Sequence, residues 1–367
     1  MKLDIPAGSR VLAAMSGGVD SSIAAYRLAQ AGMEVVGITM HLIGSKDCVG
    51  TTDASGGERA CCSIGAAREA RRAADFIGIP HHVIDFRDVF ADLVIRPVRE
   101  SYARGLTPNP CVLCNRYIKF DVLFEWAAKF GCAYVATGHY ARIMRDDEGL
   151  HLLRGMDASK DQSYFLSYLT EPQLERIVFP LGWDMKEDVR SEAKAIGLET
   201  ADRPESQDLC FVVEGDATVR TEGEKAGEIV TIDGTVIGHH TGIGAYTRGQ
   251  RKGLPGGYPQ PLYVIDIDPA TNRIIVGPES ESYSSRFSVE DVSLVSRKRD
   301  IRRFDTEVMV QIRYRNVPVP GKVTLDDSGS GRVKLREPAR AITPGQVAAW
   351  YDGDEVLGAG TISRVER

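Results

Sequence analysis

The chain has 367 residues, of which 43% are hydrophobic and 26% are charged, and its net charge is −6. These are ordinary globular values, and the length exceeds that of one typical core, so two or three domains are expected. The acidic balance argues against a protein whose whole surface binds nucleic acid. No stretch approaches eighteen consecutive apolar residues and the N-terminus has no signal-peptide core, so we predict a cytoplasmic protein without a membrane partner.

The first part of the chain predicts strands that alternate with helices. A buried strand over residues 10–15 ("RVLAAM") precedes a glycine turn and an apolar-periodic helix, and "MEVVGITMHL" is a second β-rich run. A helical stretch over 63–78 leads to a third strand over 79–86, and "CAYVATGHYARI" (132–143) supplies a fourth. This alternation is typical of an α/β domain with a parallel sheet covered on both faces.

The texture of the sequence changes after a helix predicted from Met185 to Ile196. From about Glu214 the chain consists of short β-branched segments separated by glycine-rich turns, such as "GEIVTIDGTVIGHHTG" and "GKVTLDDSGSGRVKL". Alternating runs with such turns predict antiparallel β units. We therefore expect an α/β domain over 1–213, a small central β-rich domain over 214–280 and a C-terminal barrel or sandwich over 281–367.

The glycine turn after the first strand has the sequence "MSGGVDSS" (Met15 to Ser22). Adjacent glycines permit positive φ, and the following helix offers free N–H groups and the positive end of its dipole to an anion. The loop lacks the lysine of the Walker motif GxxxxGK[ST], which contacts the γ-phosphate. A phosphate loop without this lysine suits a reaction that cleaves ATP between the α and β phosphates. The alternative interpretation is a tight turn with a capping serine.

Seven cysteines occur in the chain, and in so long a sequence they do not resemble a disulfide scaffold. Cys111 and Cys114 form a CxxC pair, for which zinc binding, redox switching, cluster binding and nucleophilic chemistry are all possible. Zinc needs four ligands, and no second pair lies nearby. We interpret Cys61, Cys62 and Cys132 as structural thiols.

A basic segment runs from Ser296 to Asn316, where seven Lys and Arg face three acids, a net charge of +4. Such runs are most often solvated surfaces, and a contact with nucleic acid is the alternative.

The motif "SGGVDSS" resembles the PP-loop of the ATP pyrophosphatase group, whose members adenylate a carbonyl or carboxyl oxygen and release diphosphate. Further motifs, "TPNPCVLCNRYIKFDVL", "ATGHYAR", "KDQSYFL", "FPLG", "ESQDLCFV", "HHTGIGAYTRGQRKGL", "LYVIDID", "IRYRN" and "AITPGQVAAWY", follow the order of the bacterial tRNA-specific 2-thiouridylase family from about Val11 to Ile362. The resemblance implies a PP-loop (HUP-like) α/β domain, a small central domain and a C-terminal β-barrel. It also implies a transferase that uses ATP to thiolate the wobble uridine (U34) of tRNA.

The same resemblance implies roles for individual residues. Cys114, in NPxxxCN, would be the nucleophile, and Cys210 would carry the persulfide and form a transient disulfide with Cys114. ATP would contact Ala14, Met15, Ser16, Gly17, Gly18, Val19, Asp20, Ser21, Met40 and Gly138. The target base would contact Asn109, Pro110 and Cys111, and the tRNA would contact His139, Lys160, Asp161, Gln162, Arg313, Tyr314 and Gln346. Arg313 lies inside the basic segment, which favours the nucleic-acid interpretation of that segment.

Cys111 departs from the family pattern, because many members have Asp at this position. The substitution creates a third thiol, so Cys111, Cys114 and Cys210 could instead hold a [4Fe-4S] cluster. The expected cofactors are ATP and Mg²⁺, with the cluster as an alternative, and the expected sulfur donor is a cysteine desulfurase or a sulfur-relay protein. Two alternative functions are adenylation of a small metabolite and non-catalytic binding of nucleotide or RNA.

Overall fold

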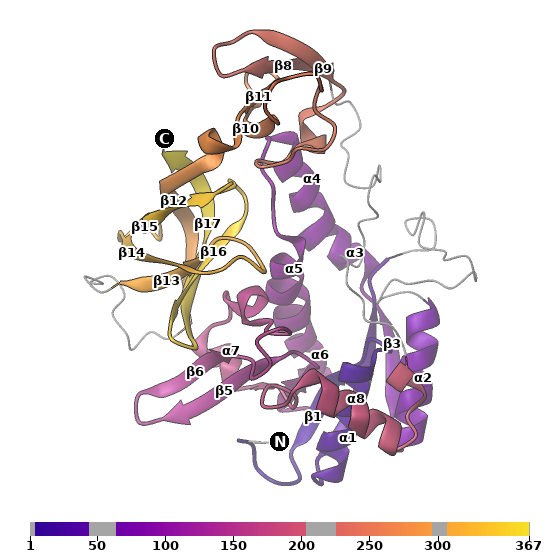
Figure 1. Ribbon diagram of the computed structural model, residues 1–367. Coiled ribbons are helices and arrows are strands. Elements are labelled where there is room, and N and C mark those ends of the chain that lie inside the picture. The colour runs from indigo at the N-terminus through magenta and orange to yellow at the C-terminus, as the bar shows by residue number, and fades with distance from the viewer. Residues whose placement is uncertain (1–3, 44–63, 203–224, 296–306, 367) are drawn as a thin grey trace. The chain divides into compact units, whose positions relative to one another are not determined.

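The computed structural model describes residues 4–43, 64–202, 225–295 and 307–366 (Figure 1). Cys48, Cys61, Cys62, Cys210 and residues 296–306 of the basic segment lie outside these ranges. The chain forms two compact units. The first unit comprises Met1–Val94, Cys111–Asp216 and Asp354–Val356, and the second comprises Ile95–Pro110, Ala217–Gly353 and Leu357–Arg367. Within the described ranges, no helix combines the length and the apolar character that crossing a bilayer requires.

The first unit is built on a five-stranded sheet in the order β3-β2-β1-β4-β7, in which every neighbouring pair is parallel. Its strands are β1 (Arg10–Ala14), β2 (Glu34–His41), β3 (His81–Asp85), β4 (Tyr134–Ala136) and β7 (Ile177–Val178). The predicted parallel sheet is therefore confirmed. The chain runs from β1 outward to β3 and then returns to place β4 on the other side of β1. The strand order thus reverses beside β1, which is where open α/β sheets bind ligands.

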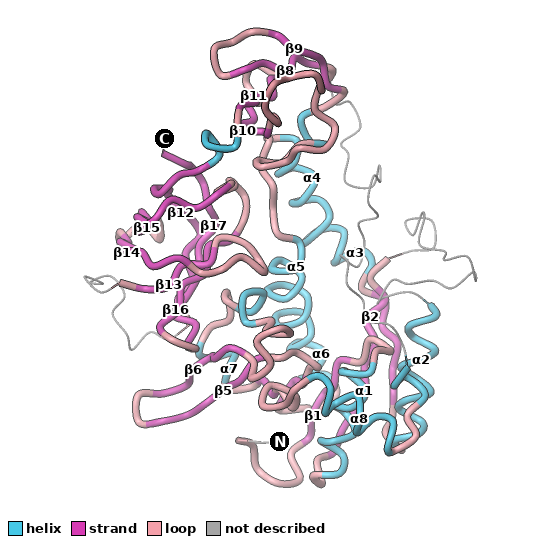
Figure 2. Tube along the Cα trace, in the orientation of Figure 1, coloured by secondary structure: helices cyan, strands magenta, loops and turns pink. Residues whose placement is uncertain are grey.

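Helices cover both faces of β1, as Figure 2 shows by secondary structure. The covering helices are α1 (Val19–Gln30), α2 (Ile64–Ile77), α6 (Leu123–Lys129) and α8 (Lys186–Ala195). Val11 packs in a buried cluster with Ile23 of α1 and Val189 of α8. The next residue, Leu12, packs on the opposite face with Leu123 of α6. Because successive strand residues point to opposite faces, the continuous apolar run of β1 requires a helix layer on each side.

Shorter helices complete this part of the chain. They are α3 (Arg87–Phe90), the π-helices η1 (Ala91–Ile95) and η2 (Cys114–Val122), α5 (Pro110–Leu113), α7 (Glu171–Leu174), and the 3₁₀-helices η3 (Ser163–Leu166) and η4 (Glu199–Asp202).

The run predicted as one strand over 132–143 divides between two sheets. Its first part is β4, whereas its end starts β5 (Ala141–Asp146), which pairs antiparallel with β6 (Gly149–Arg154). The break falls around Gly138, where a Cβ would stand 2.8 Å from the backbone nitrogen of Ser21. The chain can approach the first turn of α1 this closely only without a side chain. Packing against α1 therefore ends the strand where residue preference would continue it.

The second unit contains helix α4 (Arg96–Ala103) and a four-stranded sheet in the order β10-β11-β8-β9. Its strands are β8 (Gly227–Thr231), β9 (Val236–His240), β10 (Tyr263–Asp268) and β11 (Arg273–Gly277), accompanied by η5 (Ile243–Ala245) and η6 (Glu279–Ser282). Ile229, Val264 and Ile274 form its buried core. β8 and β11 pair parallel, so the expectation of wholly antiparallel units is wrong for this pair. Two intervening strands separate β8 from β11, and this long connection permits the parallel pairing.

The remaining strands of the second unit close into a barrel. They are β12 (Tyr283–Leu294), β13 (Val308–Gln311), β14 (Val319–Leu325), β15 (Gly331–Arg340), β16 (Val347–Asp352) and β17 (Glu355–Glu366). The order β12-β15-β14-β13-β16-β17 is closed by pairing of β12 with β17. Phe287, Val323 and Trp350 lie in the buried interior. The predicted C-terminal β-barrel is confirmed.

Candidate active site

The loop from Met15 to Gly18 joins β1 to α1. Gly17 has φ +72°, and a Cβ there would lie 2.4 Å from the carbonyl oxygen of Ala66, so only glycine fits. The Ser21 hydroxyl accepts a hydrogen bond from the Ser16 nitrogen and donates one to the Gly18 oxygen, each at 3.1 Å. The N–H groups of the first turn of α1 have no intrahelical acceptor, and the helix dipole adds positive potential. The loop is therefore a preformed anion site.

Three strand ends bring the expected ATP residues to one edge of the sheet. Ala14 ends β1, Met40 is the penultimate residue of β2, and Gly138 follows β4 by two residues. Since β2, β1 and β4 are adjacent and parallel, these positions share the carboxyl edge. Gly138 approaches the backbone of Asp20 and Ser21 directly. The structure thus gathers residues from three separate motifs around the start of α1.

Lys186 is a residue of this site that the sequence reasoning missed. Its Nζ lies 2.6 Å from both carboxylate oxygens of Asp20, and the Tyr140 hydroxyl donates to the same carboxylate at 2.9 Å. The Lys186 side chain is buried, whereas that of Asp20 is 31% exposed, so the pair lies at the edge of the anion site. The sequence shows a lysine at the start of the predicted helix 185–196, but it gives no sign that its partner is Asp20, 166 positions away.

Two further contacts fix the position of Lys186. The carboxylate of Asp157 accepts the backbone N–H of Lys186 at 3.0 Å, which anchors the start of α8. Burial alone would raise the pKa of Asp157, but hydrogen bonds from Ser159 and from the Lys186 backbone lower it, so the carboxylate stays ionised. Arg27 of α1 forms ion pairs with Asp184 and with Glu192 of α8, each at 2.6 Å. The hydrogen bond to Asp157 and the ion pairs of Arg27 therefore fix α8 against α1, and this places the ammonium group of Lys186 beside the start of α1.

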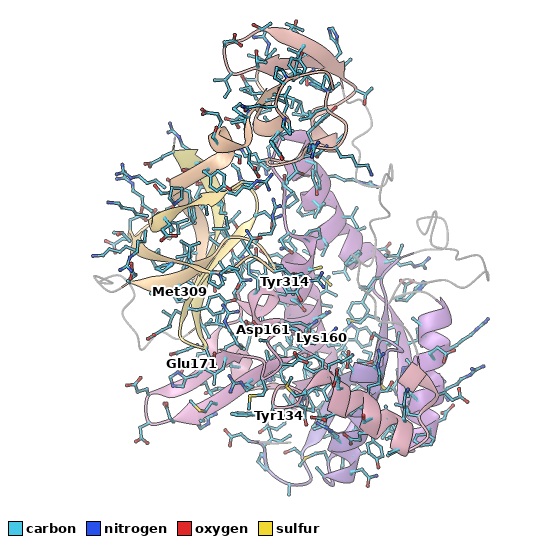
Figure 3. All side chains as sticks on the ribbon, viewed as in Figure 1. Tyr134, Lys160, Asp161, Glu171, Met309 and Tyr314 are labelled. Carbon is cyan, nitrogen blue, oxygen red and sulfur yellow. The ribbon has the colours of Figure 1, made fainter. Side chains whose placement is uncertain are left out.

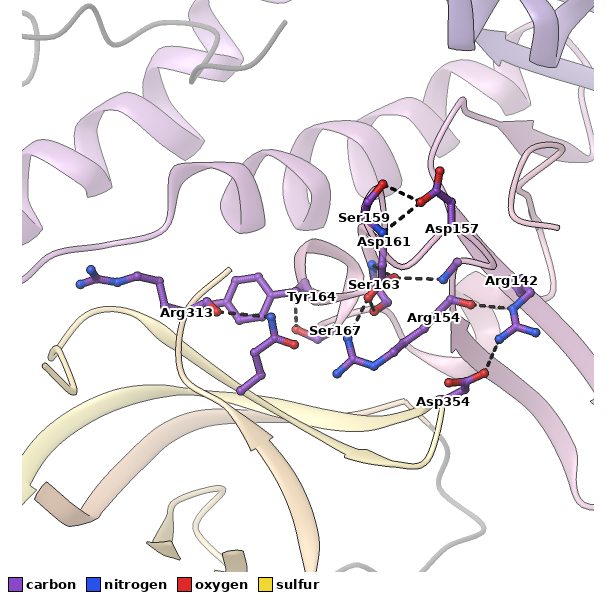
Figure 4. Close-up of polar contacts among 12 residues, drawn as sticks. Arg142, Arg154, Asp157, Ser159, Asp161, Ser163, Tyr164, Ser167, Arg313 and Asp354 are labelled. Atoms are coloured by element: carbon purple, nitrogen blue, oxygen red, sulfur yellow. Dashed lines mark hydrogen bonds and ion pairs between the residues drawn. The ribbon is translucent and has the colours of Figure 1, made fainter. Parts of the chain in front are cut away.

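The loop after β6 carries three residues predicted to contact tRNA, Lys160, Asp161 and Gln162. Figure 3 labels Lys160 and Asp161. Asp161 accepts hydrogen bonds from the backbone of Gly155 and Ser163 and forms an ion pair with Arg154 at 2.8 Å (Figure 4). Gln162 accepts the Tyr140 backbone N–H at 3.0 Å. Asp161 and Gln162 therefore shape the loop, and their contact with tRNA stays a prediction.

The two cysteines of the CxxC pair lie in consecutive helices, Cys111 in α5 and Cys114 in η2. Cys114 is the first residue of η2, and both Cys111 and Cys114 are half-buried. Burial and the neighbouring Cys111 raise the pKa of the Cys114 thiol and the positive charge of Lys119 lowers it, which leaves the pKa at about 11. In the described ranges, no three His, Cys, Asp or Glu side chains are grouped to hold a metal. Cys210 lies outside those ranges.

His139 is buried beside the end of β4, with 7% of its surface exposed. Its Nδ1 lies 2.7 Å from the Thr137 hydroxyl, and its Nε2 lies 3.4 Å from Nζ of Lys119. The ring of Phe179 meets the imidazole edge to face at 5.9 Å. Burial and the charge of Lys119 hold the pKa of His139 well below its usual range, so the ring is neutral. Contact of this buried ring with tRNA stays a prediction.

In the second unit, Gln346 is 8% exposed, and its amide donates to the carbonyls of Thr107 and Pro108 at 3.0 and 3.2 Å. The amide of Asn109 donates to Gln346 Oε1 at 3.5 Å. Gln346 therefore holds the segment that contains two of the expected base-contacting residues, Asn109 and Pro110.

The turn after β13 carries the other expected tRNA residues of the second unit. Arg313 donates to the Thr343 hydroxyl at 3.1 Å, and the guanidinium of Arg315 lies over the ring of Tyr314 at 5.4 Å. Arg315 is exposed, whereas Arg313 and Tyr314 are half-buried. A ring stacked with a guanidinium is a surface suited to bases and phosphates.

An anion-binding turn at the carboxyl edge of a parallel sheet, without a Walker lysine, is the architecture of a PP-loop nucleotide-binding protein. Comparison with known families agrees. Residues 9–214 match the family described as "tRNA methyl transferase HUP domain", residues 208–278 match "tRNA methyl transferase PRC-barrel domain", and residues 284–362 match "Aminomethyltransferase beta-barrel domain".

Full-length relatives carry one name, tRNA-specific 2-thiouridylase MnmA. The protein of Carboxydothermus hydrogenoformans is 45% identical over 369 residues, which cover 99% of this chain and 100% of that protein. The protein of Geobacter metallireducens is 45% identical and covers 97% of each chain, and that of Rhodospirillum rubrum is 42% identical over 97% of each. The chain belongs to the MnmA family of tRNA-specific 2-thiouridylases.

A solved complex titled "Crystal structure of a 4-thiouridine synthetase - RNA complex with bound ATP" is 18% identical. It covers 56% of this chain and 46% of that chain at a TM-score of 0.35, which is too low to bear on the site.

Gly138→Ala should weaken ATP binding at least tenfold, because its Cβ would press on the backbone of Ser21 and distort the first turn of α1. Overpacking of this kind costs about 1–3 kcal/mol. Isothermal titration calorimetry with ATP measures the effect. Gly256→Ala is the control, since a Cβ at Gly256 meets nothing within 4 Å. Equal ATP affinities for the two variants would contradict the assignment of Gly138 to the ATP site.

Lys186→Met should also weaken ATP binding at least tenfold, because it leaves the charge of Asp20 unbalanced beside the phosphates. Removing both charges, in Asp20→Asn with Lys186→Met, should restore part of the affinity. Lys194→Met, on the exposed side of the same helix, is the control. Calorimetry of wild type, Asp20→Asn, Lys186→Met and the double variant forms a double-mutant cycle. A loss of stability without a loss of ATP affinity would show that the pair is only structural.

Proposed function

We propose that this protein makes 2-thiouridine at the wobble position (U34) of tRNA, using ATP to activate the C2 oxygen. The observation that carries the proposal is the 45% identity to a tRNA-specific 2-thiouridylase across essentially the whole of both chains. The anion site at the start of α1 supports it, because activation with ATP requires a phosphate-binding loop.

The oxygen of the uridine C2 carbonyl is a very poor leaving group, so the first step converts it into a better one. The C2 oxygen attacks the α-phosphorus of ATP, the bond between the α-phosphorus and the bridging oxygen breaks, and diphosphate leaves. The base then carries an O-adenylyl group, which departs as AMP. The anion site of α1 would bind the phosphates, and the Lys186–Asp20 pair would set the charge at its edge.

The second step delivers sulfur. Cys210 would receive sulfur as a persulfide, and the Cys114 thiolate would attack the inner sulfur of that persulfide. The S–S bond breaks, a Cys114–Cys210 disulfide forms, and hydrosulfide leaves with the electron pair. Hydrosulfide then forms the C–S bond at C2, the C–O bond to AMP breaks, and a proton is released. Two cysteine thiols are thereby oxidised, so a dithiol reductant must reduce the disulfide after each turnover.

The tRNA would contact His139, Lys160, Asp161, Gln162, Arg313, Tyr314 and Gln346, and the target base would contact Asn109, Pro110 and Cys111. Support for this assignment comes from the stacked Tyr314 and Arg315 and from the anchored Asn109 segment. The family matches at 9–214, 208–278 and 284–362 support domains with boundaries near 1–213, 214–280 and 281–367.

Mg²⁺ would reach the site on the phosphates of ATP, since such ions are commonly held by one or two carboxylates and substrate oxygens. A cysteine desulfurase or a sulfur-relay protein would load Cys210, and the protein would work in the cytoplasm. A [4Fe-4S] cluster on Cys111, Cys114 and Cys210 is the alternative sulfur-transfer chemistry, and Cys210 lies outside the described residues.

Release of AMP should require both tRNA with a wobble uridine and ATP, because the uridine oxygen is the group that attacks the phosphate. The test is to follow radiolabelled AMP with and without tRNA and a persulfide donor, with mass spectrometry of the tRNA product. Release of AMP without tRNA would instead indicate adenylation of a small metabolite. Absence of AMP release under every condition would indicate a binding protein.

Cys210→Ser should abolish thiolation and leave tRNA affinity within about twofold, because the residue carries sulfur and makes no phosphate contact. Cys114→Ser should do the same. Cys132→Ala is the control, since this thiol is buried in the core beside Leu12 and Val135. Thiolation by Cys210→Ser at the wild-type rate would remove the persulfide route. An anaerobically purified protein with stoichiometric iron and sulfide needed for turnover would replace that route with cluster chemistry.

A further inference from the structure

The peptide that joins Met15 to Ser16 is the entrance to the anion-binding turn. Its N–H, which belongs to Ser16, donates to the Ser21 hydroxyl of α1 at 3.1 Å. Its carbonyl, which belongs to Met15, accepts a hydrogen bond from the Thr39 hydroxyl of β2 at 2.7 Å. A trans peptide is planar, so its N–H and its carbonyl point in opposite directions. The two hydrogen bonds therefore fix the plane of this peptide from both sides.

The orientation of this peptide affects the binding of an anion. If the peptide plane flipped, the Met15 carbonyl would turn toward the first turn of α1, and the negative end of its dipole would face the phosphates. The anion site depends on N–H groups and on the positive end of the helix dipole. The hydrogen bond from Thr39 holds the carbonyl on the β2 side, and this keeps an opposing dipole out of the site.

Two further contacts with β2 hold Met15. Its backbone N–H donates to the Ile38 carbonyl at 2.8 Å. Its side chain lies close to Gly37, where a Cβ would stand 2.8 Å from Met15 Sδ and 3.1 Å from Cδ2 of His81. Met15 is 2% exposed, so water does not replace a lost partner of its carbonyl. Loss of the Thr39 hydroxyl would leave a buried acceptor unsatisfied, which favours a conformation that finds the carbonyl another donor.

His81, the first residue of β3, sets the direction of the Thr39 hydroxyl. Nε2 of His81 lies 2.9 Å from Oγ1 of Thr39. A hydroxyl has one proton to donate and Thr39 gives it to Met15, so Oγ1 accepts a hydrogen bond from Nε2–H of His81. Nδ1 of His81 is buried and has no hydrogen-bond partner among the described residues, so a proton there would lack an acceptor. The ring is therefore neutral and donates to Thr39.

The charged groups around His81 favour this neutral form. The guanidinium of Arg71, on α2, donates to the His81 carbonyl at 3.2 Å and to Asp75 at 3.1 Å. Burial, the charge of Arg71 and the neighbouring His82 lower the pKa of His81 and Asp75 raises it, which leaves the pKa at about 4. At neutral pH the ring therefore keeps one N–H, and Thr39 accepts it.

We propose that Thr39 and His81 are positioning residues for ATP binding: His81 orients the Thr39 hydroxyl, and that hydroxyl holds the Met15 carbonyl away from the phosphates. The proposal rests on the proposed function only because that function places ATP at this turn. It extends the support of the glycine loop to two side chains from the strands β2 and β3.

The test is calorimetric titration of ATP into single-site variants. Thr39→Val keeps the shape of the side chain and removes the hydroxyl, so it should weaken ATP binding about tenfold, as expected when about a tenth of the protein keeps the competent peptide orientation. Thr39→Ser restores a hydroxyl and should bind ATP within about threefold of wild type. Thr200→Val is the matched control and should bind ATP like wild type, since the Thr200 hydroxyl is buried without a hydrogen-bond partner among the described residues.

A double-mutant cycle tests whether His81 acts through Thr39. His81→Leu should weaken ATP binding about threefold, because the hydroxyl still donates to Met15 but is no longer held in that direction. His81→Gln keeps a side-chain N–H and should bind ATP more tightly than His81→Leu. Thr39→Val combined with His81→Leu should bind ATP no more weakly than Thr39→Val alone, because His81 then has no hydroxyl to orient.

A general loss of structure would give a different pattern. It would lower the midpoint of thermal unfolding together with the ATP affinity, and the effects of the two substitutions would add. The proposal is overturned if Thr39→Val binds ATP as tightly as Thr200→Val, or if Thr39→Ser binds it as weakly as Thr39→Val. Additive effects of Thr39→Val and His81→Leu would also overturn it.

The titration requires neither tRNA nor a sulfur donor, so it can fail separately from the proposed function. If the wild-type protein thiolates tRNA but the ATP affinities of the variants do not differ, Thr39 and His81 have no role in ATP binding. If the affinities differ as expected but the wild-type protein does not thiolate tRNA, the reaction is misassigned and the role of Thr39 and His81 stands.

Discussion

The turn between β1 and α1 can close only because Gly17 adopts a positive φ and leaves no side chain against the carbonyl of Ala66. This single constraint points the unpaired N–H groups of α1 at the carboxyl edge of the sheet. Gly138 then packs directly on the same helical turn, which ends β4 and turns the chain toward His139. The turns that contain Gly17 and Gly138 therefore both pack at the start of α1, and together they position the phosphate site.

Two lysines set the electrostatics of the first unit, each in a different way. Lys186 is paired with Asp20 and removes a negative charge from the edge of the anion site. Lys119 contacts the neutral imidazole of His139, and its positive charge lowers the pKa of the Cys114 thiol. Thiolation needs phosphates to be bound and a thiol to be ionised in the same protein. Neither lysine lies in the glycine loop that identifies the nucleotide.

The sequence predicted the parallel sheet, the flanking helices and the barrel, because hydrophobic periodicity reports which faces are buried. It did not predict that the run 132–143 divides between two sheets, since the cause is the close approach of Gly138 to Ser21. It did not predict the parallel pairing of β8 with β11 either, because local alternation is the same in parallel and antiparallel strands exposed on one face. Both features depend on which distant segments contact each other, and hydrophobic periodicity does not report such contacts.

The sequence by itself determined the chemistry that the protein has available: a glycine loop suited to phosphates, the thiols of Cys114 and Cys210, and a basic segment from Ser296 to Asn316. Only the tertiary structure decided which side chains act on one another. Lys186 reaches Asp20 across 166 positions, and Lys119 of η2 meets His139 from the segment that follows β4. The physical reason is that charge and hydrogen bonding act over a few ångströms, and only folding turns separation along the chain into distance.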